Sequence, residues 1–263
     1  MEYIIFLLLG LSVGTFGTLV GVGGGLILIP FFIMVMSEGG AYPYFSSAPQ
    51  IVGTSLFVVL TNALSGTLAY IWQHRVFFNA AVPFALATLP GAFFGSYIAD
   101  RFTGPTLDLC FGSFLLCMAI IMYWSSTRRP KAEPAFDPKT FRYNQVLGIV
   151  SSTFVGFLAS ILGIGGGIIH VPLMIYLLGF PTHIATATSQ FVLAVSSMMG
   201  VISHAMLQHI VWLPAICIGF GATIGAQLGA RISKRTKPHV ILVLLSTAVF
   251  ALGCRLISLG LAQ

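Results

Sequence analysis

One uncharged stretch limits what this chain can become. From Tyr143 to Ala230 the sequence contains no Asp, Glu, Lys or Arg, whereas an ordinary soluble domain is about 25% charged. A helix that crosses a bilayer needs about 20 apolar residues, so this stretch holds several crossings. The sequence therefore predicts an all-α polytopic membrane protein with almost no domain outside the membrane. Other uncharged runs cover most of the remaining chain: 3–37, 39–74, 76–99, 109–127 and 238–254.

The composition excludes most other classes of protein. Hydrophobic residues make up 57% of the chain and charged residues 7%, and the mean hydropathy is +0.99. Long continuous apolar runs, instead of short segments of alternating polarity, exclude a β-barrel. The net charge of +6 would suggest a polyanion partner in a soluble protein, but in a membrane protein the basic residues indicate orientation. We therefore expect membrane lipid as a partner, and neither an enzyme nor a nucleic-acid binder.

The glycine-rich segment near the start of the chain has a second copy. Residues 14–30 read GTFGTLVGVGGGLILIP and residues 156–172 read GFLASILGIGGGIIHVP, with five glycines and the proline at the same spacing. Repetition at this scale indicates a duplicated structural unit. We expect an N-terminal transmembrane repeat over 1–125, a linker over 126–142 and a C-terminal transmembrane repeat over 143–263. Further correspondences join Thr54-Ser55 with Thr188-Ser189, and Gly91-x-x-x-Gly95 with Gly221-x-x-x-Gly225.

The glycine run in each copy is unsuited to the interior of a helix. Each Gly costs about 1 kcal/mol there and Pro about 3 kcal/mol. We therefore expect each segment to break at its glycines, 21–25 and 163–167, and again at Pro30 and Pro172. Irregular backbone at membrane depth lines a cavity or is buried in protein, and broken helices at equivalent positions of two repeats point to the binding site of a transporter. Tight helix packing through small residues is the alternative, but consecutive glycines do not share one helix face.

Basic residues indicate how the chain crosses the membrane. One cluster lies in the linker 126–142 and another over 231–237, and the positive-inside rule puts both in the cytoplasm. The stretch between them then crosses an even number of times, which makes each glycine run a return and the repeats inverted, with only Arg101 and Arg255 outside. The alternative treats each broken segment as one crossing and divides the basic residues between the two sides. Either topology has about eight main hydrophobic segments, one of them broken or re-entrant in each repeat.

The predicted spans carry no fixed charge near mid-membrane, so the acidic residue of many cation-coupled carriers is missing. Glycine N–H groups and neutral side chains remain. A helix N-terminus carries about +0.5 charge and free N–H groups, so two such termini form a site for a small anion without a fixed cation. The expected substrate-binding residues are Gly23, Gly24, Gly25, Gly165, Gly166, Gly167, Thr54, Ser55, Thr188, Ser189, Gln190 and Asn62.

Three histidines are candidates for coupling to an ion, either a proton or sodium: His170, His183 and His204. Histidine titrates near neutral pH, and at His170 the two copies differ, because Leu28 takes the equivalent position. The cysteines lie in apolar segments without Cys-x-x-Cys spacing, which is typical of inert buried thiols. We therefore expect no cofactor and no metal site.

The doubled motif resembles that of a known transporter family. Gly-Val-Gly-Gly-Gly-Leu-Ile-Leu-Ile-Pro (21–30) and Gly-Ile-Gly-Gly-Gly-Ile-Ile-His-Val-Pro (163–172), each followed by a Thr-Ser pair, resemble the sulfite exporter TauE/SafE family, also called the toluene sulfonate uptake permease family. The resemblance extends to the length, the duplication and the basic linker. It implies a secondary transporter of small sulfur-containing anions, such as sulfite, sulfoacetate or another organosulfonate, in the bacterial inner membrane. An ion gradient would drive it by alternating access. The alternative is an anion channel or a carrier of another small anion.

Overall fold

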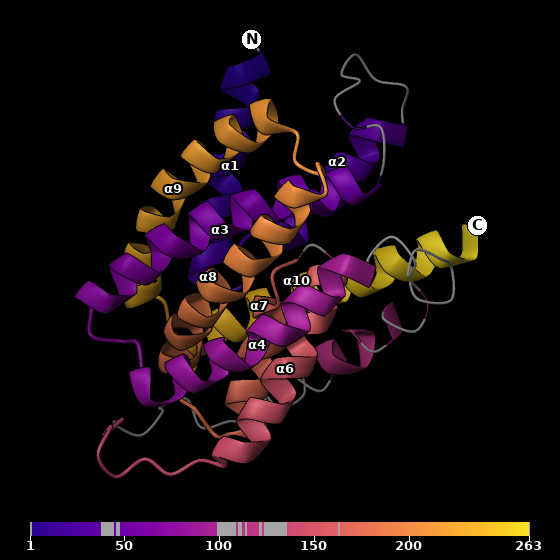
Figure 1. Ribbon diagram of the computed structural model, residues 1–263. Coiled ribbons are helices and arrows are strands. Elements are labelled where there is room, and N and C mark those ends of the chain that lie inside the picture. Colours follow the sequence, from indigo (N-terminus) through magenta and orange to yellow (C-terminus); the bar gives the residue numbers. More distant parts are fainter. Residues whose placement is uncertain are drawn as a thin grey trace.

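The computed structural model describes residues 2–37, 48–98, 136–162 and 164–262, together with Phe45 and part of the segment 109–123. Six helices in these ranges are long and apolar enough to cross a membrane, which confirms an all-α polytopic membrane protein (Figure 1). The helices are α1 (Glu2–Val20), α2 (Gly25–Ser37), α3 (Ala48–Trp72), α4 (Phe78–Ile98), α6 (Gln145–Leu162), α7 (Gly167–Pro172), the π-helix η2 (Leu173–Leu177), α8 (Thr182–Met206), α9 (Trp212–Arg235) and α10 (Pro238–Ala262).

Two long helices, α3 and α8, form the centre of the molecule. Both spans are 67% buried, more than any other span among the described residues. A β-carbon on Gly53 of α3 would lie 2.5 Å from the carbonyl oxygen of His209, just after α8, and one on Gly66 would lie 2.8 Å from Nε2 of Gln190. A residue early in α3 thus faces the end of α8, and a residue later in α3 faces an earlier part of α8. The two central helices are therefore antiparallel.

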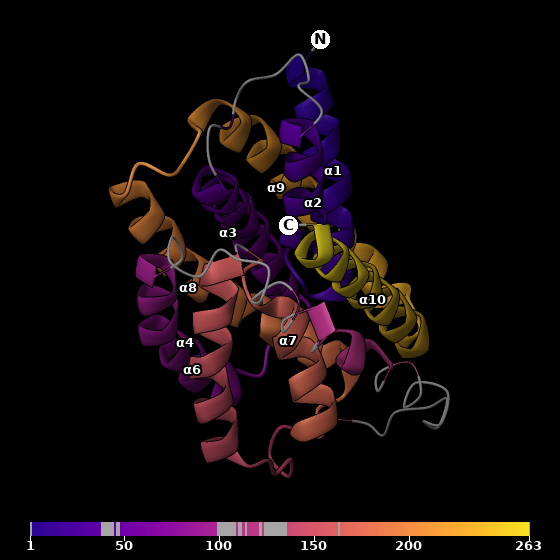
Figure 2. The ribbon, with the colours of Figure 1, turned by 90° about the vertical axis from the view of Figure 1, so that its right-hand side faces the viewer.

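Helix pairs that pack through glycine flank this centre. Figures 1 and 2 both show α1 beside α9 and α4 beside α6. On α9, β-carbons added at Gly221 and Gly225 would overlap the carbonyl oxygens of Leu7 and Leu11 in α1. On α4, one added at Gly91 would overlap the carbonyl oxygen of Thr153 in α6. Small residues let helix backbones approach this closely, and in both pairs the helices run parallel.

One end of the bundle collects basic residues, and we call it the basic end. The guanidinium of Arg75, between α3 and α4, donates a hydrogen bond to Ser233 near the end of α9. Tyr143, just before α6, donates to the carbonyl oxygen of Asn79 at the start of α4. The cluster over 231–237 and the described part of the linker, 136–142, therefore lie at the same end. In Figure 2 the connection before α6 lies at the bottom, opposite the N-terminus.

Candidate substrate site

The first glycine break reverses the direction of the chain. Gly21, Gly23 and Gly24 have φ values of 82°, 81° and 86°, a region that glycine enters without steric cost. After the break, the chain lies back against α1, since a β-carbon on Gly24 would lie 2.5 Å from Cγ1 of Val13. Helix α2 then continues away from the break. Its start at Gly25 leaves the first N–H groups without a partner in the helix.

The second break has the same geometry in its described residues. Gly165 and Gly166 have φ values of 72° and 84°, and a β-carbon on Gly166 would lie 3.0 Å from that of Ala159 in α6. Gly163, also part of the predicted break, lies outside the described residues. Helix α7 begins at Gly167, and the carbonyl oxygen of Gly166 accepts from the N–H groups of Ile169 and His170, as that of Gly24 does from two residues of α2.

The prediction of a second break at Pro30 is wrong, because α2 runs through it to Ser37. Proline removes one N–H donor from a helix, and membrane helices tolerate this loss when neighbouring groups satisfy the freed carbonyl. At Pro172 the prediction is closer, since α7 ends there and the backbone changes to the π-helix η2.

The two breaks meet between α3 and α8. A β-carbon on Gly23 would overlap Leu193, and one on Gly165 would lie 2.6 Å from both Leu193 and Val59. Gly167 packs on the backbone of the first break, where an added β-carbon would lie 2.6 Å from the carbonyl oxygen of Gly21. Val59 and Leu193 are 0% and 2% exposed. The structure therefore brings the N-termini of α2 and α7 together and closes the space between them with two apolar side chains.

The Thr-Ser pairs lie on the two central helices and are fully buried. Oγ1 of Thr54 accepts from the backbone N–H of Val211, before α9, at 3.0 Å. Oγ1 of Thr188 accepts in the same way from Phe77, before α4, at 3.1 Å. Each threonine thus fixes the connection that leads into an outer helix. The two serines are Ser55 and Ser189, and Ser189 donates to the carbonyl oxygen of Gly21 at 3.3 Å, so it touches the first break.

Asn62 and Gln190 form a buried cluster with Thr18 of α1, which we call the amide cluster (Thr18, Asn62 and Gln190). The Thr18 hydroxyl donates to Oδ1 of Asn62 at 3.1 Å, and Nε2 of Gln190 donates to Oγ1 of Thr18 at 3.2 Å and Oδ1 of Asn62 at 3.1 Å. The carbonyl oxygen of Thr18 also accepts from the N–H of Gly21. The cluster therefore borders the first break. Thr18 was not predicted; its place in the turn before the glycines is the signal that could have indicated it.

His170 lies in α7, close to the second break. Its Nε2 is 2.9 Å from Oγ of Ser152 in α6, and its ring centroid is 6.5 Å from that of Phe84 in α4. The imidazole is 3% exposed. Its contacts therefore join three helices in a closed environment.

The other two predicted histidines lie at opposite ends of α8. Nδ1 of His183 is 2.8 Å from the guanidinium of Arg75 at the basic end. Burial lowers the pKa of Arg75 below its usual value, and its guanidinium also lies over the ring of Tyr70. At the far end, Nδ1 of His204 is 3.2 Å from Nδ1 of His209. The structure does not bring the three histidines together, and the sequence did not predict the contacts of Arg75.

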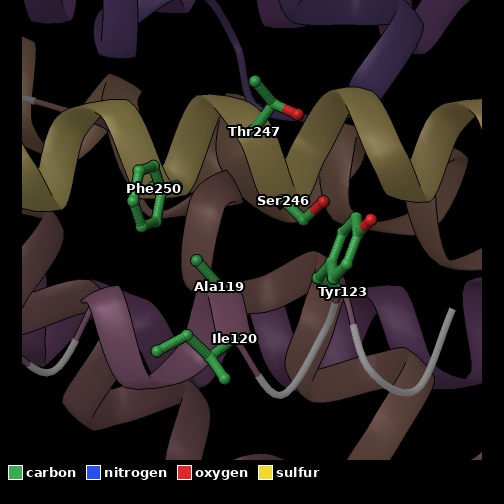
Figure 3. A pocket seen from close by; sticks show the side chains of 6 residues that line it. All are labelled: Ala119, Ile120, Tyr123, Ser246, Thr247 and Phe250. Atoms are coloured by element: carbon green, nitrogen blue, oxygen red, sulfur yellow. The ribbon is translucent and has the colours of Figure 1, made fainter. Parts of the chain in front are cut away.

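A hollow of about 290 Å³ lies away from the breaks. Figure 3 shows it between α10 and the segment 109–123. Ile120 and Phe250 at its rim are 61% and 49% exposed, as expected for side chains that face lipid. None of the predicted binding residues lines it. Its lining consists of Ala119, Ile120, Tyr123, Ser246, Thr247 and Phe250.

The sequence of the chain matches a known protein family. A sequence profile described as sulfite exporter TauE/SafE matches this chain over residues 6–256. The chain belongs to the sulfite exporter TauE/SafE family. This family consists of membrane transporters, so the fold and the family agree.

Curated relatives include transporters from bacteria, archaea and plants. The TauE/SafE protein described here is 33% identical to the probable membrane transporter protein YunE of Bacillus subtilis, over 99% of both chains. It is 26% identical to a probable membrane transporter protein of Methanocaldococcus jannaschii, over 95% of this chain and 93% of that one. It is 29% identical to sulfite exporter TauE/SafE family protein 3 of Arabidopsis thaliana, over 41% of this chain and 24% of that one. No solved structure matches the chain.

Proposed function

We propose that this TauE/SafE protein is a secondary transporter that moves a small sulfur-containing anion, such as sulfite, sulfoacetate or another organosulfonate, across the bacterial inner membrane. The meeting of the two glycine breaks carries the proposal. N–H groups at helix N-termini suit the oxygen atoms of an oxyanion, and a site built from these neutral groups would allow release. The name of the plant relative refers to sulfite, which supports this class of cargo.

The anion would bind where α2 and α7 begin. In this role the N–H groups of Gly23 to Gly25 and of Gly165 to Gly167 contact its oxygens. The contact of Ser189 with Gly21 supports a place for the Thr-Ser pairs beside the anion, with the threonines positioning the surrounding helices. The basic end would face the cytoplasm, since basic residues mark that side of most membrane proteins.

Transport would proceed by alternating access, driven by an ion gradient. Val59 and Leu193 close the site in the state described here, so the anion can enter only when these side chains separate. Two halves of inverted topology could rock about this contact and open it to one side at a time. Three features support inverted halves: the antiparallel central helices, the pairing of α1 with α9 and that of α4 with α6.

Flux into proteoliposomes of purified protein tests the proposal. Sulfite, sulfoacetate, thiosulfate, sulfate and a carboxylate would be compared, with and without a proton or sodium gradient. We expect saturable flux of a sulfur oxyanion, with counterflow exchange. An anion current far above the turnover rate of a carrier would instead indicate a channel. Selective flux of the carboxylate would indicate a carrier of another anion.

Two variants test the location of the site. Gly24→Leu and Gly166→Leu would each press a side chain against the preceding helix, α1 or α6, and displace the start of α2 or α7. We therefore expect protein that reaches the membrane but does not transport. Full activity in both folded variants would contradict the placement of the anion at the breaks.

A further inference from the structure

We propose that the amide cluster of Thr18, Asn62 and Gln190 is a binding site for a sodium ion. Its role as the coupling ion rests on the proposed transport function, whereas binding itself does not. The cluster joins α1, α3 and α8 and is fully buried, with 0% exposure at each of its three residues.

The geometry of the cluster suits a small cation. Nε2 of Gln190 lies 3.1 Å from Oδ1 of Asn62 and 3.2 Å from Oγ1 of Thr18, and those two oxygens are 3.1 Å apart. A half-turn of the Gln190 amide exchanges its nitrogen and oxygen. It would complete a triangle of three neutral oxygens, with sides of the length that oxygens have when they share one small cation. The carbonyl oxygen of Gly14 lies 2.9 Å from Nδ2 of Asn62 and offers a further oxygen at the edge.

The hydrogen bonding of Gln190 is incomplete in the closed state. Oε1 of Gln190 is buried and has no hydrogen-bond partner among the residues that the structure describes, although buried polar atoms are nearly always paired. This oxygen lacks a donor or a cation. Rotation of the amide would bring this oxygen onto a sodium ion at the centre of the cluster.

The surroundings favour a monovalent cation over other ligands. The cluster lies at the last turns of α1, and a helix C-terminus carries about −0.5 charge. Divalent cations are normally held by carboxylates, and the cluster has none. A proton needs a group that titrates, and neither amides nor a threonine hydroxyl do so in the physiological range. A small monovalent ion with oxygen ligands fits all three conditions.

The cluster has no chemical equivalent in the other half of the sequence. By the correspondence that joins Thr54 with Thr188, Gln190 corresponds to Leu56 and Asn62 to Ser196. A leucine in place of the glutamine removes the third oxygen. We therefore infer one sodium ion for each chain.

An ion at this site would act directly on the first glycine break. The carbonyl oxygen of Thr18 accepts from the N–H of Gly21, and Ser189, next to Gln190, donates to the carbonyl oxygen of Gly21. Sodium would thus fix both sides of the turn that positions the N-terminus of α2. The end of α1 would hold the cation, and the start of α2 would hold the anion.

The test measures sodium binding without any anion. Purified protein in detergent would be titrated with sodium chloride against choline chloride, with bound 22Na⁺ and the melting temperature as the two measurements. We expect wild-type protein to bind 22Na⁺ at one ion per chain and to become more stable as sodium rises. Gln190→Leu should lose both responses. Gly66→Ala should weaken them without changing a ligand, because its methyl group would lie 2.8 Å from Nε2 of Gln190.

Gln227→Leu is the matched control. Gln227 is another glutamine in a membrane helix, but it is only partly buried and donates to Ser65 outside the cluster, so this variant should keep the full sodium response. Wild-type protein that binds no 22Na⁺, or folded Gln190→Leu protein that binds as wild type does, would overturn the proposal. Anion flux that is saturable but indifferent to sodium would overturn the coupling role alone. Sodium binding without flux of any anion would support the sodium site but refute the proposed transport function.

Discussion

Glycines with positive φ serve two different purposes in this protein. At Gly24 the backbone turns sharply and also lies against α1, whereas at Gly179, between η2 and α8, the backbone turns in open space. The two φ values are similar, at 86° and 75°. A β-carbon on Gly24 would lie 2.5 Å from Val13, but one on Gly179 would have no atom of the described residues within 4 Å. The difference between them therefore isolates the contribution of close packing at the break.

Gly24→Ala and Gly179→Ala form a matched pair of variants. In both variants the strain of a left-handed backbone should lower the free energy of unfolding by about 1–2 kcal/mol. Because only the first also overlaps a neighbour, we expect Gly24→Ala to lower the free energy of unfolding by about 1–3 kcal/mol more than Gly179→Ala. Thermal unfolding in detergent measures both. Equal losses would show that the reversal is not tightly packed against α1.

Thr188 offers a second test at the same scale. Thr188→Val keeps the shape but leaves the N–H of Phe77 without its acceptor, whereas Thr188→Ser keeps the hydroxyl. We expect the valine variant to lose about 1–3 kcal/mol of stability and the serine variant to lose less. An unchanged melting temperature with abolished flux would contradict the structural role and indicate a hydroxyl that serves the anion alone.

Some of these residue roles could be predicted from the sequence, and others could not. Consecutive glycines indicated the breaks because no helix face accommodates them. The partners of Thr54 and Thr188 lie 157 and 111 positions away, and Thr18 meets Gln190 across 172 positions. A local pattern carries no information on which distant segment a buried hydroxyl will face, so these contacts appear only in the fold.

At the level of elements, the outer helices depend on glycine for their spacing. The carbonyl oxygen of Leu11 in α1 occupies the space where Gly225 of α9 would carry a β-carbon. Gly219, on the same helix, has more room, because the nearest atom to its β-carbon would be the Thr61 hydroxyl at 3.1 Å. The four-residue spacing of glycines in the sequence predicted this kind of packing but not its partner. The sequence also did not reveal that α2 continues through Pro30.

We expect Gly225→Ala to push α1 away from α9 and to cost about 1–3 kcal/mol. Gly219→Ala should be neutral or slightly stabilising, because alanine is favoured over glycine within a helix by about 1 kcal/mol. Melting temperatures of the two purified variants give the comparison. A stable Gly225→Ala protein would contradict the backbone contact between the two helices.

At the level of the whole molecule, both described basic segments lie at one end of the bundle. Lys139 and Arg142 precede α6, and the cluster over 231–237 covers the last turn of α9 and the residues just after it. Gln208 lies at the other end, in the exposed connection after α8. The sequence predicted from charge alone that both clusters lie on the same side, because the positive-inside rule groups basic residues on one side of the membrane.

Cysteine labelling tests which side that is. In a variant without its native cysteines, Lys234→Cys should react with a membrane-impermeant maleimide only after the cells are permeabilised. Gln208→Cys should react in intact cells, since the opposite end would face outward. The reverse pattern would place the basic end outside and contradict the positive-inside assignment.

The pairing of α1 with α9 has a consequence for how the protein is made. The ribosome delivers α1 first, and about 200 further residues must be synthesised before α9 can cover its glycine-fitting face. Until then, lipid acyl chains contact the surface of α1 that α9 later covers. During this time insertion factors or proteases can bind the growing chain. A gene divided within the linker should therefore yield two fragments that are degraded when expressed separately and that survive when produced together in one cell.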